Sequence, residues 1–438
     1  MEGRTVMVDN QKTFMNKMRI LYLLNTFPRI SSETVIVNEI VELIKLGHEI
    51  KILAHDKEWG KIHEKVIQYN LPQNTIYTYV KEYKRGTEKA LDFIIKAFSD
   101  LIKNPFKTVI LLFWAVKNYE NIWHLFDSYL GSKKILNSEF DVIYTPFAYL
   151  NCLFHAFYIS KILKKPFVVT FRAVDIYEKF TKKQLKSKIK LVKKSAGIIT
   201  ISTYNETNIV EKFGIKNKIE IVHSSTDIDY FKPTGDKKKR KIVSICRFIE
   251  KKGIKYLIKA CNILKNKGVN FECLLIGDGP LKNEYKELME RYKLKEHINI
   301  KGFLVMEEIK KELSDSMVFV LPCIIAKNGD RDILPNVLKE AMAMEIPVIT
   351  SDICGIEELI ENKKNGILVP PKNPRAIADA IEKLFAEKEL REELGKAARE
   401  KIKNDFNVKK EAKKLEGIFS QVVFLDNHPQ EFKNISDK

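Results

Sequence analysis

The chain of 438 residues is long enough for two domains of about 150–200 residues each. Its 45% hydrophobic and 30% charged residues are typical of a soluble globular protein with an ample core. The net charge of +19 favours anionic partners, namely nucleotide phosphates, nucleic acid or acidic lipid headgroups. A lysine-rich composition along the whole chain explains the charge equally well, so charge alone selects none of these partners.

The cysteines and the apolar runs indicate the cellular compartment of the protein. The six cysteines show no C-x-x-C spacing and lie mostly in apolar runs, which indicates small core residues in a reducing compartment and argues against disulfides or a metal site. The N-terminus has no apolar segment of the secretory type, and the longest strongly apolar run, residues 108–116, is too short to span a bilayer. We therefore expect a cytoplasmic protein, and peripheral binding at the inner face of the cell membrane stays open.

The first half of the chain has the pattern of a parallel α/β sheet. After a polar, irregular stretch at residues 1–17, which we expect to be disordered, Arg19–Leu24 is an apolar run rich in strand formers. A helix is predicted from Glu33 with Ser32 as N-cap, and Glu49–Leu53 reads as the next strand. The loop between strand and helix is a natural ligand-binding position. Further strands are predicted at residues 142–144, 167–170, 197–201 and 219–222.

Residues 88–130 interrupt this alternation with helical sequence in which aromatic residues and lysines are interspersed. One interpretation is a segment that lies at the bilayer surface or meets a lipid-linked acceptor. The other interpretation, which we favour slightly, is a pair of helices packed over the sheet. Both hold if one face packs and the other binds.

A second α/β unit follows a polar linker. Pro233, Gly235 and the basic run at residues 237–241 mark the linker, and strands are predicted at residues 241–246, 271–276, 298–301, 317–321, 347–350 and 366–369. The predicted fold class is α/β, with two Rossmann-like, doubly wound domains facing each other across a cleft. The predicted segments are 1–17 (extension), 18–225 (N-terminal domain), 226–240 (linker), 241–405 (C-terminal domain), 406–425 (terminal helix) and 426–438 (disordered tail).

Three loops of the second unit carry candidate chemistry at the carboxyl edge of its sheet. Arg247 and Lys252 flank a short turn after the opening strand and could bring two cations to a diphosphate, although two surface cations are a common alternative. Gly277 and Gly279 allow a tight turn after the second strand, but Lys282 stands where a dinucleotide-binding fingerprint has its third glycine.

The third loop, GDRDILPNVLKEAMAM, runs from residue 329 to residue 344. Pro335 is predicted in the first turn of a helix whose free amides favour phosphate or a developing negative charge. Asp332 stands before the helix, and Glu340 lies one turn beyond Asn336 on the same face. Carboxylates beside an anion site accept hydrogen bonds from hydroxyl groups, so the stretch predicts a ligand with phosphate and sugar parts. An ordinary capped helix with solvated acids is the alternative.

Together these motifs resemble family 4 glycosyltransferases of the GT-B fold. The pattern is an Arg-x(4)-Lys-Gly turn, a strand ending in G-x-G-P, and an acid eight residues before a Glu-Ala-Met-Ala helix. FPRISSETVIVNEI at residues 27–40 is similar to the opening of the exopolysaccharide, colanic-acid-type branch, as are NPF at Asn104, TFRAVDIY at Thr170 and DIDYFKP at Asp227. The resemblance extends from residue 18 to about residue 424. It implies that residues 18–225 form the acceptor domain, that residues 241–405 form the donor domain, and that the helix at 406–425 crosses back to the first domain.

The resemblance implies a role for each matching residue. Arg247 and Lys252 would hold the diphosphate of a nucleotide sugar, Asp332 would face the donor sugar, and Glu340 would bind the ribose hydroxyls. Around these four, the expected donor-binding residues are Gly277, Gly279, Ile333, Leu334, Pro335, Asn336, Gly355 and Glu358. The expected acceptor or cleft residues are Ser31, Ser32, Glu33, Arg172 and Asp175.

The resemblance further implies a retaining transfer in which the leaving diphosphate takes the acceptor proton. Three residues depart from the family pattern: Asp332 is shorter than the usual glutamate, Arg172 stands where many relatives have histidine, and Ser225 replaces a glycine before the linker. The D-x-D triplets Asp227/Asp229 and Asp330/Asp332 would suit a divalent ion. The first lies in the linker and Arg331 crowds the second, so we expect neither a metal nor another cofactor.

The predicted function is therefore transfer of a sugar from a UDP- or GDP-sugar to a glycan or lipid-linked acceptor in polysaccharide or glycoconjugate biosynthesis. The expected partners are the donor, that acceptor and an anionic membrane surface, without nucleic acid. Two alternatives remain: a sugar-nucleotide epimerase or phosphorylase of the same fold, and a non-enzymatic basic protein that binds membrane or nucleic acid. The second alternative leaves Arg247, Lys252 and Glu340 unexplained and has no recognisable nucleic-acid motif.

Overall fold

The computed structural model describes residues 17–28, 34–56, 63–77, 95, 99, 134–135, 137–233 and 240–428. The predicted N-terminal extension, apart from residue 17, lies outside these ranges. So do Ser31, Ser32 and Glu33, the NPF segment, and the aromatic stretch 88–130 apart from residues 95 and 99. Predictions for these residues remain predictions.

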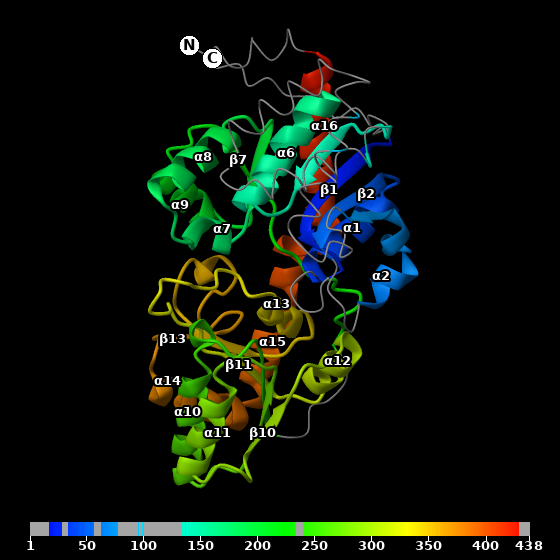
Figure 1. Ribbon diagram of the computed structural model, residues 1–438. Helices are drawn as coiled ribbons and strands as arrows, with labels where there is room; N and C mark the ends of the chain where they lie inside the picture. Colours follow the sequence, from blue (N-terminus) through cyan, green and yellow to red (C-terminus); the bar gives the residue numbers. More distant parts are fainter. Residues whose placement is uncertain are drawn as a thin grey trace, which may run out of the picture.

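Two parallel sheets organise the described chain (Figure 1). The first has seven strands in the order β3-β2-β1-β4-β5-β6-β7, and every pairing is parallel. Its strands are β1 (Arg19–Thr26), β2 (Glu49–Asp56), β3 (Thr75–Tyr77), β4 (Val142–Thr145), β5 (Phe167–Phe171), β6 (Gly197–Thr200) and β7 (Ile219–Ile221). Its helical segments are α1 (Thr34–Lys45), α2 (Glu64–Gln68), η1 (Leu71–Asn74), α6 (Leu150–Leu163), α7 (Val174–Tyr177), α8 (Lys182–Val192) and α9 (Thr203–Phe213).

Burial on both faces explains why the strands of the first sheet are continuous apolar runs. Successive residues of a strand point to opposite faces, and in β1 Leu21 and Leu23 join the core under α6, α8 and α9. Ile20, Tyr22 and Leu24 join the core on the other face, under α1. The sheet is therefore doubly wound, as predicted.

The second sheet has six parallel strands in the order β10-β9-β8-β11-β12-β13. Its strands are β8 (Lys241–Ile245), β9 (Glu272–Ile276), β10 (Ile298–Lys301), β11 (Val318–Leu321), β12 (Val348–Ser351) and β13 (Ile367–Val369). Its helical segments are η2 (Glu250–Lys252), α10 (Ile254–Asn266), α11 (Lys282–Arg291), α12 (Met306–Ser314), α13 (Asn336–Ala343), η3 (Ile356–Glu358), α14 (Pro374–Ala386) and α15 (Lys388–Asp405). In both sheets the strand order reverses beside the first strand, between β1 and β4 and between β8 and β11. In Rossmann-like folds ligands bind at the carboxyl ends of the strands at this point.

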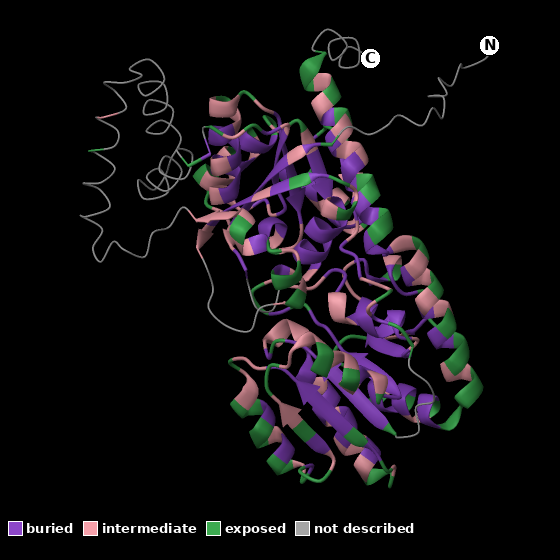
Figure 2. Ribbon diagram, turned by 90° about the vertical axis from the view of Figure 1, so that its right-hand side faces the viewer, coloured by how far each residue is buried: buried purple, intermediate pink, exposed green. Residues whose placement is uncertain are grey.

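The last helix returns to the first domain. α16 (Val408–Asn427) begins beside the second domain and runs along the first (Figures 1 and 2). Leu415, Phe419 and Val422 are buried in the same core as α1, and the Phe419 ring meets the Tyr144 ring edge-on at 5.0 Å. α16 ends at Asn427, two residues into the segment predicted as a tail.

Candidate functional site

Backbone contacts hold the turn after β8 against the loop after β11. Gly253 has φ of +66°, and a Cβ atom there would lie 1.9 Å from the Pro322 carbonyl oxygen, so only glycine fits. The Ile324 amide donates to the Lys251 carbonyl oxygen at 2.8 Å. This contact brings the predicted diphosphate lysine beside the loop that carries Asp332, at the point where the strand order reverses.

Asp332 is half-buried between two lysines. Lys252 Nζ donates to Asp332 Oδ2, and Lys251 Nζ lies 3.3 Å from Asp332 Oδ1. Burial opposes ionisation of Asp332, but Lys252 and Lys251 outweigh it and lower its pKa. Asp332 in turn raises the pKa of Lys252, against the effect of burial. The site therefore holds a fixed ammonium–carboxylate pair, whereas the sequence had assigned the two groups to different parts of a ligand.

Arg247 stands at the exposed end of β8, and its guanidinium contacts no described acceptor. The Gly277 and Gly279 loop lies behind this turn. A Cβ atom would meet the Cys246 carbonyl oxygen at 1.9 Å from Gly277 and the Phe248 carbonyl oxygen at 2.6 Å from Gly279. The close backbone approach predicted for these glycines is thus an approach to the backbone of residues 246–248 of the same chain.

α13 begins one position later than predicted. Pro335 is its N-cap, with ψ of 128°, and Asn336 is the first helical residue. The first amides of an α-helix have no intrahelical acceptor, so this end faces the loop of Ile333 and Leu334 as a potential anion site. Both of those side chains are buried in the core of the second domain, which fixes the loop.

Glu340 is a buried carboxyl group, 7% exposed, on the second turn of α13. Burial raises its pKa to about 7, and the neighbouring Lys339 opposes the shift only in part. Burial likewise lowers the pKa of Lys339 to about 7. Lys339 Nζ donates to the Ser224 carbonyl oxygen, and the Ser224 hydroxyl donates to Asn336 Oδ1 at 2.9 Å. Two residues of α13 are thereby fixed to the crossover from the first domain.

Glu358 and Gly355, predicted beside the nucleotide, lie at the contact with the first domain. Glu358 Oε2 accepts from the Thr203 amide at 3.0 Å, and His223 Nε2 lies 2.9 Å from Glu358 Oε1. A Cβ atom at Gly355 would lie 2.4 Å from the Cβ of Tyr204, the second residue of α9. The carboxylate of Glu358 is thus occupied by protein donors.

Arg172 and Asp175 are also engaged by protein. Asp175 is 1% exposed, and its carboxylate accepts from the amides of Ala148 and Arg172 at 2.8 and 2.9 Å. Arg172 Nε donates to the Pro146 carbonyl oxygen at 3.0 Å, and Arg172 Nη2 lies 3.6 Å from Glu39. Asp175 therefore shapes the loop at the carboxyl edge of the first sheet, and Arg172 faces the domain boundary with part of its hydrogen-bonding capacity in use.

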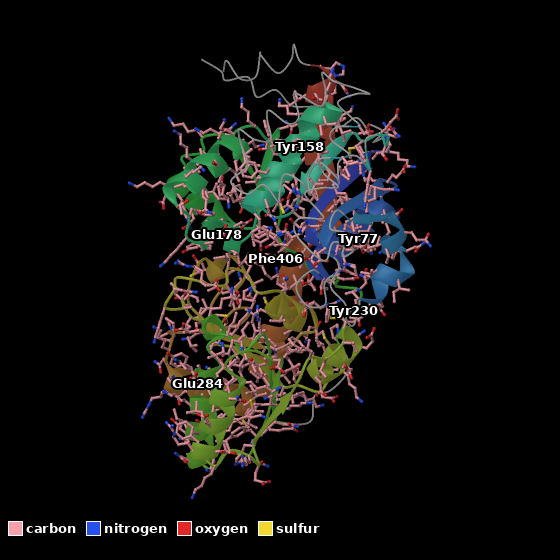
Figure 3. All side chains as sticks on the ribbon, viewed as in Figure 1. Tyr77, Tyr158, Glu178, Tyr230, Glu284 and Phe406 are labelled. Atoms are coloured by element: carbon pink, nitrogen blue, oxygen red, sulfur yellow. The ribbon has the colours of Figure 1, made fainter. Side chains whose placement is uncertain are left out.

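Sequence reasoning missed several residues at this boundary. The Arg331 guanidinium lies 4.8 Å from the Tyr177 ring centroid and 3.4 Å from the Tyr204 hydroxyl. Phe406 lies where the two domains meet (Figure 3), 4.7 Å ring-to-ring from His223. A lysine beside Glu340 in the mostly apolar NVLKEAMA helix was a signal for Lys339. The contacts of Arg331 and Phe406 depend on the relative placement of the two domains, which no sequence pattern indicates.

The D-x-D triplets are paired with lysines. Asp227 accepts from Lys65, Asp229 pairs with Lys409 at 2.7 Å, and Lys251 Nζ lies 3.0 Å from Asp330. Within the described ranges no three His, Cys, Asp or Glu side chains form a group that could hold a metal ion. Nor does any helix there combine the length and apolar character needed to cross a membrane.

Comparisons with known proteins agree with this arrangement. Residues 225–401 match the family model described as "Glycosyl transferases group 1". The putative colanic acid biosynthesis glycosyltransferase WcaL of Escherichia coli is 28% identical over 89% of this chain and 96% of its own. The amylovoran biosynthesis glycosyltransferase AmsK of Erwinia amylovora is 26% identical over the same shares.

Solved structures show the same fold. A glycosyltransferase from Rickettsia africae superposes with a TM-score of 0.70 at 20% identity, covering 93% of this chain and 99% of its own. Anabaena HepE in complex with UDP superposes with a TM-score of 0.69 at 15% identity, covering 92% and 100%. The paired Rossmann-like sheets and the group 1 domain define the class: the chain is a glycosyltransferase of the GT-B fold. More particularly, it is similar over nearly their whole length to two glycosyltransferases of colanic acid and amylovoran biosynthesis.

Proposed function

We propose that the protein transfers a sugar, with retention of anomeric configuration, from a UDP- or GDP-sugar to a glycan or lipid-linked acceptor. The product belongs to polysaccharide or glycoconjugate biosynthesis, and the enzyme works at the inner face of the cell membrane. The observation that carries the proposal is the Lys252–Asp332 pair, which joins the turn that carries Arg247 to the loop that leads into α13 and Glu340. Cations for a diphosphate and carboxylates for hydroxyl groups are the donor set that a nucleotide sugar requires.

Each residue has a role in this proposal. Arg247 and Lys252 bind the diphosphate and stabilise the charge that develops on it. Asp332 contacts the hydroxyl groups of the donor sugar and Glu340 those of the ribose. As the bond from the anomeric carbon to the diphosphate oxygen breaks, the acceptor oxygen bonds to the same face of that carbon. The acceptor proton passes to the leaving diphosphate, so no carboxylate nucleophile is needed.

Metal-independent transfer is part of the proposal. It is supported by the lysines that pair with the acids of both D-x-D triplets. We expect full activity in excess EDTA. A complete loss that Mg²⁺ or Mn²⁺ restores would contradict this part and leave the rest standing.

The test is donor binding followed by transfer. A panel of UDP- and GDP-sugars is screened for a rise in melting temperature, because a ligand of the native state stabilises it. The best donor is then assayed with lipid-linked and free glycans. Lys252→Ala should lower kcat/KM by about 10²–10³-fold, the range for removing one preorganised charge-stabilising group. Lys251→Ala is the matched control because it also removes a partner of Asp332, and it should cost less than tenfold. Equal losses would show that only Asp332 pairing matters and would refute the diphosphate role of Lys252.

A further inference from the structure

A lysine face on α8 is the largest local charge imbalance in the described chain. Residues 179–194 contain eight lysines and no acidic residue. All of these lysines except Lys188 are exposed. No described residue forms an ion pair or hydrogen bond with any of the seven exposed ammonium groups. The only ion pair in the segment joins the buried Lys188 to Glu178 at 3.8 Å.

A lysine-rich composition does not by itself explain this face, because three other surface helices carry balanced charge, and α10, which also lacks acidic residues, has only three lysines. α11 has three basic and three acidic residues, α15 has six and five, and α16 has four and three. α8 has five and none. Like charges one helical turn apart destabilise a helix, so an unbalanced face is retained at a cost in stability.

The surroundings of α8 extend the imbalance. α6 packs against α8, contains no acidic residue and is followed by Lys164 and Lys165. Residues 150–218 hold 15 basic and four acidic residues, a net charge of +11, which is more than half of the charge of the whole chain. The positive charge of the chain is therefore concentrated in the part of the first domain that contains α6, α8 and α9.

The fold fixes these lysines outward. Leu191 and Val192 are buried in the first-domain core, and Leu185 and Ile189 pack against it. The Thr181 and Gln184 side chains form a capping box that fixes the start of the helix. α8 lies on the outside of the first domain beside α9 (Figure 1). The result is a packed, capped helix that presents a row of exposed ammonium groups.

We propose that this face docks the enzyme on an anionic lipid bilayer. The inference takes up the membrane partner of the proposed function and assigns it to particular residues, but its test does not depend on sugar transfer. Lysines are point charges that suit the diffuse negative potential of anionic headgroups. Nucleic-acid surfaces add stacking aromatic side chains and arginines that read bases. Residues 179–194 contain no arginine, and their one aromatic side chain, Phe180, packs against the core.

The test compares two fourfold variants of the full chain. The first carries Lys182→Gln, Lys183→Gln, Lys186→Gln and Lys190→Gln on α8. The control carries the same substitution at four exposed lysines of α15 and α16, namely Lys388, Lys396, Lys410 and Lys413. Both variants lose the same net charge. Binding is measured by co-sedimentation with vesicles of phosphatidylcholine alone and of phosphatidylcholine with phosphatidylglycerol, at 0.1 M and 0.5 M NaCl.

We expect the unmodified chain to bind only the anionic vesicles and to dissociate at 0.5 M NaCl. A lysine near such a surface is worth about fivefold in binding, so the α8 variant should bind at least ~30-fold more weakly. The control should change binding less than about fivefold. Nucleoside diphosphate release in the absence of vesicles should be equal in all three proteins, which separates this inference from the proposed activity.

Three outcomes would overturn the inference. They are no binding to anionic vesicles, equal loss in both variants, and binding that survives in the α8 variant. RNA binding that the α8 substitutions abolish, without vesicle binding, would assign the face to nucleic acid instead.

Discussion

Glu340 illustrates how burial alone changes a carboxyl group. It is the second acid of the family pattern, yet no described side chain donates a hydrogen bond to it, and its pKa rises to about 7 because its charged form is desolvated. The carboxyl group is therefore largely protonated at pH 6. A ribose that brings hydroxyl donors would favour the charged form, so donor binding and proton release are coupled at this residue.

A stability measurement tests this state of Glu340. Its folded pKa is above its unfolded value of 4.5, so between pH 4.5 and 7 the native state keeps a proton that the unfolded chain has lost. Stability must then fall as the pH rises through this window. Glu340→Gln removes this dependence. We expect the variant to gain up to about 3 kcal/mol over the unmodified chain between pH 4.5 and pH 8, at ~1.4 kcal/mol per pKa unit.

Urea unfolding at the two pH values measures this gain. Glu357→Gln, at an exposed position of η3, is the control, and it should change the unfolding free energy by the same amount at both pH values. If Glu340→Gln changes the unfolding free energy by the same amount at pH 4.5 and at pH 8, Glu340 is not held in a buried, protonated state.

The residue types of the candidate site could be predicted from the sequence, but their pairing could not. Lys252 and Asp332 were placed at the same edge of the sheet because both follow parallel strands. That Gly253 must touch Pro322, and so bring the two side chains together, depends on backbone packing that no local pattern records. Asp175 was predicted to face the cleft, yet two backbone amides hold its carboxylate.

At the scale of elements, the apolar runs predicted the strands within three residues because parallel strands are buried on both faces. β3 was missed because its three residues are only half-buried and carry no apolar pattern. α16 was assigned to the first domain only through the family resemblance, and its buried residues in the first-domain core give that assignment a physical basis.

Gly355 tests the contact between η3 and α9. Its φ of +75° and that of Gly268, +72°, impose the same strain on an alanine, but a Cβ meets Tyr204 only at Gly355 and open space at Gly268. Gly268→Ala should cost about 1 kcal/mol and leave activity unchanged. Gly355→Ala should cost more and lower kcat/KM at least ~10-fold, because the domains must separate to admit the methyl group. Unfolding and steady-state kinetics of the pair decide this, and equal effects would mean that the contact is not maintained in solution.

Phe419 tests the attachment of α16. Its side chain is fully buried against Tyr144, whereas Phe424 on the same helix is 48% exposed. Phe419→Ala should destabilise the protein by about 3–5 kcal/mol. Phe424→Ala should cost less than about 0.5 kcal/mol, as for most surface substitutions. Urea unfolding measures both, and a small loss for Phe419→Ala would mean that α16 is not part of the first-domain core.

At the scale of the whole molecule, the sequence predicted two domains but not what joins them. Thr203, Tyr204, His223 and Ser224 of the first half meet Glu358, Gly355 and Asn336 of the second. These contacts depend on the relative placement of two independently wound sheets, and no periodicity encodes that placement. Residues predicted to face the nucleotide thus form part of the domain contact, so we expect substrate binding and domain arrangement to be coupled if that prediction holds.

His223 makes the domain contact dependent on pH. It lies between η3 and α16: its Nε2 is 2.9 Å from Glu358 and its Nδ1 is 3.7 Å from Glu411. Burial alone would lower the pKa of His223, but the hydrogen bond of its imidazole with Glu358 and the nearby negative charge of Glu411 outweigh burial and raise the pKa above 6.5. The stabilisation is therefore fully present below pH 6.5 and is lost as the pH rises through the folded pKa.

We therefore expect His223→Gln to cost more stability at pH 6 than at pH 9. The difference should be about 1–2 kcal/mol, the worth of a charge-assisted hydrogen bond relative to a neutral one. Urea unfolding at the two pH values measures it, and His428→Gln, at the end of α16 away from any acid partner in the described chain, is the control. If His223→Gln costs the same at both pH values, the imidazole is neutral throughout and the two carboxylates do not hold a proton at the domain boundary. If the cost is larger at pH 6, a proton that His223 holds between Glu358 of η3 and Glu411 of α16 stabilises the arrangement in which both halves of the site face each other.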